Sequence, residues 1–192
     1  MSNMADKIEG ILRQARTLRN EKRLSEAKGF LLAALRTVMT DEFRLEHREQ
    51  SAKMYAQLGQ IERDMGRPEK ALKCYEEAAE LYRAARETQK LAHTIRHLAD
   101  IHQEQGNLES SEACYEKALN LYSHCEKTPP LELANAVRGL ALLKERERDA
   151  LEARVLWEKA HTLYTIAEVE AGTVECSQHL KLLKGQPSHK AN

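Results

Sequence analysis

One eight-residue pattern occurs three times in this sequence and decides the fold. It reads Tyr75-Glu-Glu-Ala-Ala-Glu-Leu-Tyr82, then Tyr115-Glu-Lys-Ala-Leu-Asn-Leu-Tyr122, then Trp157-Glu-Lys-Ala-His-Thr-Leu-Tyr164, at offsets of 40 and 42 residues. The two aromatic residues of each copy are seven positions apart, so both rings lie on one face of an α-helix. A fixed period of this length is typical of stacked structural repeats. We therefore expect these rings to form the core of a helical repeat.

A second set of residues confirms the period. Leu58, Leu98, Leu140 and Leu180 follow one another at 40, 42 and 40 residues. The first three are each followed by a small residue, Gly or Ala, which lets two helices approach closely. Turn signals lie midway through two units, at Gly66-Arg-Pro68 and Gly106-Asn107. Each unit is therefore predicted to be a helix, a short turn and a second helix.

The pattern extends over nearly the whole chain. The expected helices span residues 4–19, 24–39, 41–65, 68–85, 88–105, 108–123, 130–147, 149–167 and 169–184. They form one repeat domain over 1–184, with units at about 8–40, 41–85, 88–123 and 130–167 and a capping helix at 169–184. The tail, 185–192, is expected to be disordered.

Composition excludes several classes of protein. The 192 residues include 30 Lys plus Arg and 30 Asp plus Glu, so the formal net charge is zero and there is no global electrostatic case for binding nucleic acid. Gly (8) and Pro (4) occur at about half their usual share, and β-branched residues are scarce, which favours helices over a β-rich fold. No segment reaches the roughly 20 apolar residues that span a bilayer. The four Cys form no C-x-x-C pair, and the first residues lack the pattern of a signal peptide, so we expect a cytoplasmic protein.

The repeat resembles the tetratricopeptide repeat. One unit matches through Leu58-Gly59, Gly66, Ala71, Tyr75 and Ala78; the next through Leu98-Ala99, Gly106, Tyr115 and Ala118; the third through Leu140-Ala141, Ala153, Trp157 and Ala160. The period exceeds the usual 34 residues and is similar to that of the long-repeat, kinesin-light-chain-like branch. The resemblance implies an all-α, right-handed superhelical solenoid of about four helix pairs plus a C-terminal capping helix.

The resemblance also implies a concave groove lined by the first helix of each unit. Mapped residue by residue, its polar side chains are Lys53, Gln57, Gln60, His93, Arg96, His97, Asp100, Asn135 and Arg138. The same mapping adds Ala56, Gly139 and Leu142 and, on the last helix, Glu175, Gln178, His179 and Leu182. A stripe that can carry several positive charges suits an acidic or C-terminal carboxylate segment of a partner. The alternative is that these side chains are simply the solvated faces of exposed helices.

We therefore expect a non-catalytic adaptor that binds a peptide or a partner-protein segment in this groove. We expect it to use no cofactor and to bind neither nucleic acid nor a membrane. No Gly-rich phosphate loop or nucleophile elbow is present. His93, His97 and Asp100 share one helical face, which is spacing for a divalent metal, but no fourth ligand can be named, and we expect no metal site. The alternatives are a self-associating structural scaffold, with homo-oligomerisation, and a peptide-sensing regulatory protein. The sequence identifies neither the partner nor whether the groove or the convex face binds it.

Overall fold

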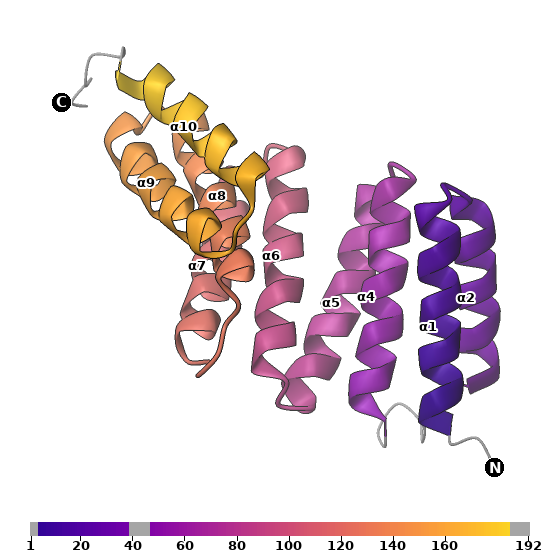
Figure 1. Ribbon diagram of the computed structural model, residues 1–192. Helices are drawn as coiled ribbons and strands as arrows, with labels where there is room; N and C mark the ends of the chain where they lie inside the picture. The colour runs from indigo at the N-terminus through magenta and orange to yellow at the C-terminus, as the bar shows by residue number, and fades with distance from the viewer. Residues whose placement is uncertain (1–3, 39–46, 185–192) are drawn as a thin grey trace. The chain divides into compact units, whose positions relative to one another are not determined.

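The computed structural model describes residues 4–38 and 47–184, and these residues are almost entirely helical, with no strand among them (Figure 1). In chain order the helices are α1 (Met4–Asn20), α2 (Leu24–Val38), α4 (Arg48–Asp64), α5 (Pro68–Ala84), α6 (Thr88–Glu104), α7 (Leu108–Ser123), α8 (Pro130–Arg146), α9 (Ala150–Ile166) and α10 (Glu170–Lys184). The expectation of an all-α helical repeat is confirmed.

Helix bounds agree with the predicted ranges to within a residue or two, with one exception. A helix was expected from residue 41, whereas α4 begins at Arg48 after the non-helical residue His47. Residues 41–46 and the tail 185–192 lie outside the described residues, so the expectations about them concern parts of the chain that the structure does not describe.

Most of the turns between helices are built in the same way. The second residue after the helix has a positive φ, between 56° and 79°, after α1, α4, α5, α6, α8 and α9. At Gly66, for example, Arg67 N donates to Glu62 O and Gly66 N donates to Arg63 O, which satisfies carbonyls that the helix end leaves without a partner. Glycine adopts this conformation without steric cost, but Arg86 and Arg148 adopt it too. A Gly is therefore sufficient to signal this turn but is not required for it.

The chain divides into two compact units, 1–94 and 95–192, with the boundary inside α6. In the first unit, α1 packs on α2 and α4 packs on α5, around Ile8, Leu31, Met54 and Ile61. In the second unit, α8 packs between α7 and α9, and α10 packs on α9 (Figure 1). Both units therefore use the helix-on-helix packing that the period predicted.

The aromatic residues of the repeated pattern form the core, as expected. Tyr75, Tyr82, Tyr115, Tyr122, Trp157 and Tyr164 are all buried. Glycines on neighbouring helices make room for three of these rings, because a Cβ on Gly59 would lie 3.1 Å from Tyr75, one on Gly139 2.4 Å from Tyr115, and one on Gly172 2.5 Å from Tyr164. Gly139 is therefore a packing residue rather than a groove residue.

Candidate functional site

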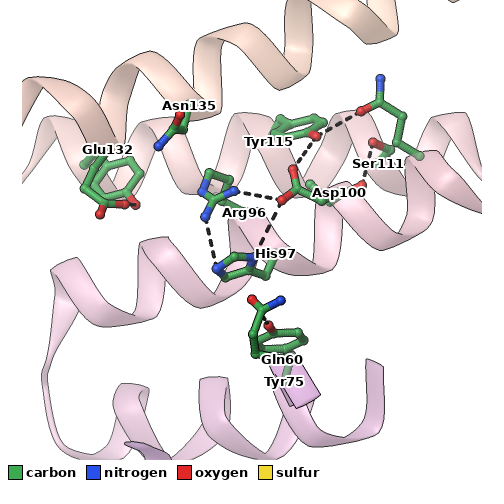
Figure 2. A network of polar contacts seen from close by, with 12 residues as sticks. Gln60, Tyr75, Arg96, His97, Asp100, Ser111, Tyr115, Glu132 and Asn135 are labelled. Carbon is green, nitrogen blue, oxygen red and sulfur yellow. Dashed lines mark hydrogen bonds and ion pairs between the residues drawn. The ribbon is translucent and has the colours of Figure 1, made fainter. Parts of the chain in front are cut away.

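The polar stripe of the second unit is centred on three side chains of α6. Arg96 Nη1 donates to Asp100 Oδ2 at 2.8 Å, and Arg96 Nη2 lies 3.0 Å from Nε2 of His97 (Figure 2). His97 Nδ1 lies 3.6 Å from the same carboxylate oxygen. Arg96 is only 9% exposed, and its Nε atom has no hydrogen-bond partner. The helical spacing that suggested a metal site therefore produces a network centred on an Arg–Asp ion pair.

A residue of the next helix completes this network. The hydroxyl of Tyr115 on α7 donates to Asp100 Oδ1 at 2.7 Å and also lies 3.0 Å from Oε1 of Gln103 (Figure 2). Burial raises the pKa of Asp100, but hydrogen bonds from His97 and Tyr115 and the charge of Arg96 outweigh it and lower the pKa to about 2. Asp100 is therefore a carboxylate at any pH at which the protein is expected to work.

The stripe continues on α8 and α10. Arg138 donates from Nε and Nη2 to the two carboxylate oxygens of Glu175, at 2.7 and 2.6 Å, in the bidentate geometry that makes Arg–carboxylate pairs strong. This hydrogen bonding raises the pKa of Arg138 and lowers that of Glu175. About a third of each side chain remains exposed. Asn135, one turn earlier on α8, accepts a hydrogen bond from the Tyr164 hydroxyl at 2.8 Å.

The stripe of the first unit is built in the same manner on α4. Lys53 Nζ lies 2.8 Å from Glu9 on α1 and 3.2 Å from Glu49 on its own helix, and the hydrogen bond to Glu9 is the main cause that raises its pKa. Gln57 donates to the backbone carbonyl of Leu12 at 2.8 Å. These contacts join first helices that are about 45 residues apart in the sequence.

Two further predicted residues complete the first-unit stripe. Gln60 donates to Asp64 at 2.9 Å and accepts from the Tyr75 hydroxyl at 3.1 Å. His93, on α6, is half-buried. All nine residues lie on α4, α6 and α8, and several of them make polar contacts with neighbouring helices.

Sequence reasoning missed two features of the site. The repeat tyrosines are not only core residues, because Tyr75 and Tyr115 each hold the stripe residue fifteen positions earlier, and Trp157 donates to Glu145 twelve positions earlier. The spacing of fifteen is visible in the sequence and could have signalled this role. The second feature is the charge of the stripe: Lys53, Arg96 and Arg138 are each paired with a carboxylate of the chain, so the expected positive groove is largely neutralised.

Within 4–38 and 47–184, no group of three or more His, Cys, Asp or Glu side chains is placed to hold a metal ion. Among the helices described there, none combines the length and the apolar character needed to cross a membrane.

Comparison with known proteins agrees with the architecture. The tetratricopeptide repeat model matches residues 50–124, and no curated protein sequence matches the chain. Among solved structures, BtubC (BKLC) from P. vanneervenii is 19% identical with a TM-score of 0.68, covering 96% of this chain and 85% of that chain. The apo form of RapI is 11% identical with a TM-score of 0.81, covering 95% of this chain and 69% of that chain. At these identities the likeness concerns the fold alone.

The match and the structural neighbours identify the repeat. Its long period is consistent with the kinesin-light-chain-like branch. Residues 50–124 therefore belong to the tetratricopeptide repeat family, and the chain has the helical-repeat fold of that family.

Proposed function

We propose that this protein is a non-catalytic interaction module that binds a segment of a partner protein on the polar stripe of its first helices. The tetratricopeptide repeat fold is typically an architecture for protein–protein interaction rather than for catalysis. The Arg138–Glu175 pair is the observation that supports this surface as the binding site. The pair lies on the stripe, and about a third of each side chain is in solvent. A partner can therefore reach both charges without unfolding the helices.

The binding step is an exchange of ion pairs. A carboxylate of the partner, from an acidic side chain or a C-terminus, takes the place of Glu175 and accepts the two guanidinium hydrogen bonds of Arg138. Such an exchange leaves the number of charge-assisted hydrogen bonds unchanged, so its cost is small. In the first unit, Lys53 offers an equivalent exchange with Glu9, and the amides of Gln57 and Gln60 lie on the same helix.

The α6 network has a different role in this mechanism. Arg96 and His97 are too buried to meet a partner directly, so together with Asp100 they hold Tyr115 against the stripe from beneath. The partner then contacts a surface that is already ordered, which lowers the entropy lost on binding.

The test uses two substitutions of opposite expected effect. Affinity capture from a lysate of the source organism, with identification by mass spectrometry, provides a partner whose Kd is then measured by calorimetry. In a Glu175→Gln background, Arg138→Gln should weaken binding by about tenfold or more, because there the bidentate charged contact with the partner forms without displacing Glu175. Glu175→Gln should preserve or strengthen binding, because it removes the competing carboxylate.

Arg83→Gln on α5 is the matched control. Arg83 pairs with Glu80 at 2.5 Å, is comparably exposed and lies outside the stripe. Its replacement should leave the Kd unchanged. Equal affinities for Glu175→Gln and for the Glu175→Gln, Arg138→Gln double variant would show that the stripe of the second unit is not the binding surface.

A further inference from the structure

Two ion pairs join neighbouring helix pairs of the repeat. In the first unit, Lys28 Nζ on α2 lies 2.6 Å from Glu62 Oε1 on α4. In the second unit, Lys144 on α8 pairs with Glu112 on α7. Each pair therefore links the second helix of one repeat to the first helix of the next.

The repeat alignment makes these two pairs equivalent. Glu62 and Lys144 each lie four positions after a repeated Leu. Lys28 and Glu112 each follow a small buried residue, with a large and a small buried residue three and six positions later. The polarity is reversed, because the second helix provides the base in the first pair and the acid in the other. The remaining equivalent positions hold no acid–base pair: they are Leu72 with His102, and Arg154 with Lys184.

The charge on the first helix is buried in both pairs. Glu62 is 3% exposed and Lys144 is 8% exposed. A buried charge cannot turn into water, so it is sensitive to the charge that it meets across the junction. Losing its partner is far more costly than at the surface, where water screens the charges. A buried pair of this kind adds little to stability by itself, but it discriminates strongly between a matching and a non-matching partner.

The other charged neighbours of Glu62 and Lys144 do not depend on the stacking order. Arg67, 3.7 Å from Glu62, lies at the turn between α4 and α5. Glu147 and Glu152, 3.1 and 3.6 Å from Lys144, lie at the turn between α8 and α9 and in the first turn of α9. These neighbours belong to the same helix pair as the buried charge and stay beside it. Only the side chain on the preceding second helix changes when a different helix pair is stacked there.

From this arrangement we infer that the two ion pairs specify which helix pairs stack on each other. If α4 stacked on α7, Glu62 would meet Glu112, and if α8 stacked on α2, Lys144 would meet Lys28. Either exchange buries two like charges, whereas the native order buries opposite ones. The reversed polarity therefore excludes both exchanges, within one chain and between two copies of it.

Exchange between copies is the failure that such a device prevents. Helix pairs of one repeat family resemble one another in shape, and misassembly and domain swapping are characteristic of repeat proteins during folding. Two copies that exchange helix pairs form a dimer without any new kind of contact. The charge at the junction is then what separates the correct from the exchanged stacking.

Reversing one junction of the full chain tests the inference. Lys28→Glu with Glu62→Lys keeps opposite charges between α2 and α4 and keeps the net charge at zero. It also gives this junction the polarity of the α7–α8 junction, so both exchanges become favourable. Arg67 is 44% exposed and can turn into water, away from the new base at position 62.

Two measurements follow the consequences. In urea unfolding monitored by circular dichroism, Lys28→Glu alone should lower the equilibrium constant for folding by about tenfold or more, and adding Glu62→Lys should recover most of this loss. Refolding by dilution from urea at about 100 μM, followed by sedimentation velocity, reports on the stacking order. The double swap should then give several-fold more dimer than the parent.

Two controls separate stacking order from general effects. Glu80→Arg with Arg83→Glu swaps an exposed pair within α5, again without changing the net charge, and should refold like the parent. Leu31→Ala removes a buried apolar side chain of α2 without changing any charge. It should lower the stability but should not increase the dimer fraction as the double swap does.

The inference is overturned if Glu62→Lys does not recover the stability lost by Lys28→Glu, because the two charges then do not act as a pair. It is also overturned if the double swap refolds with the same monomer fraction as the parent. A dimer fraction for Leu31→Ala equal to that of the double swap would attribute the exchange to instability and would overturn it too. None of the substituted residues lies on the stripe, so these results are independent of the proposed partner binding.

Discussion

The most direct test of the architecture is to remove the ring of Tyr115. This side chain is 1% exposed and packs with Ala99, Leu140 and Leu143, and its ring fills the space beside Gly139. Replacing a fully buried aromatic residue by Ala costs about 3–5 kcal/mol. Tyr115→Phe keeps the ring and removes only the hydroxyl. We expect it to cost about 1–2 kcal/mol, because the charged carboxylate of Asp100 loses the hydrogen bond that the hydroxyl donates.

The assay follows from the position of the one tryptophan. Trp157 is fully buried in the same unit as Tyr115, so its fluorescence during urea unfolding reports on that unit. With a slope near 2 kcal/mol/M, the Ala variant should unfold at a urea midpoint about 2 M below the parent, and the Phe variant at about 0.5–1 M below it. Leu131→Ala is the control, since this side chain lies in the same unit, is already 39% exposed and should cost less.

Two results would refute the reasoning. If Tyr115→Ala unfolds within about 0.5 kcal/mol of the parent, the repeat ring is not what holds the unit together. If the Phe variant loses as much stability as the Ala variant, the hydroxyl contacts and not the ring packing provide the stability.

Other predictions concern glycines and acid stability. Gly139→Ala should destabilise the second unit by more than about 1 kcal/mol, because the new Cβ would clash with Tyr115. Gly10→Ala lies in open space within α1 and should raise the stability by up to about 1 kcal/mol. Thermal melts check both changes. Gly66→Ala should lose about 1 kcal/mol at its left-handed turn and Arg86→Gly should not, which denaturant midpoints can compare. The lowered pKa of Asp100 stabilises the folded protein by about 2 kcal/mol above pH 4. This stability is lost as the pH falls toward 2, because the carboxylate becomes protonated. Asp100→Asn should therefore flatten this part of the curve of stability against pH, measured by urea unfolding.

Much of the fold could be predicted from the sequence, because the signals for it are local. A ring recurring every 40 or 42 residues, with a second ring seven positions later, determines which face of each second helix is buried. The six rings of the pattern are buried as expected. The helix ranges followed from the same periodicity and from turn signals at Gly66 and Gly106. At Arg148 no Gly marks the turn, so only the periodicity predicted the helix end. In the structure Arg148 adopts the same positive φ as the glycines of the other turns.

The candidate site could be predicted only in outline. The repeat register identified which residues of the first helices belong to the stripe, but it did not identify their partners. Arg138 and Glu175 are 37 positions apart, and Lys53 and Glu9 are 44 apart. Which carboxylate a long, flexible side chain meets depends on how neighbouring helices pack, which no local signal carries.

The sequence by itself thus determined the repeat, its period, its buried rings and the helices on which the stripe lies. The tertiary structure decided the charge of that stripe, since it placed Glu9, Asp100 and Glu175 within reach of Lys53, Arg96 and Arg138. It also decided that Gly139 packs against Tyr115 instead of facing a partner. The physical reason is that burial of a helix face depends on a periodic pattern along one segment, whereas ion pairs and close approaches depend on distances between segments that only packing sets.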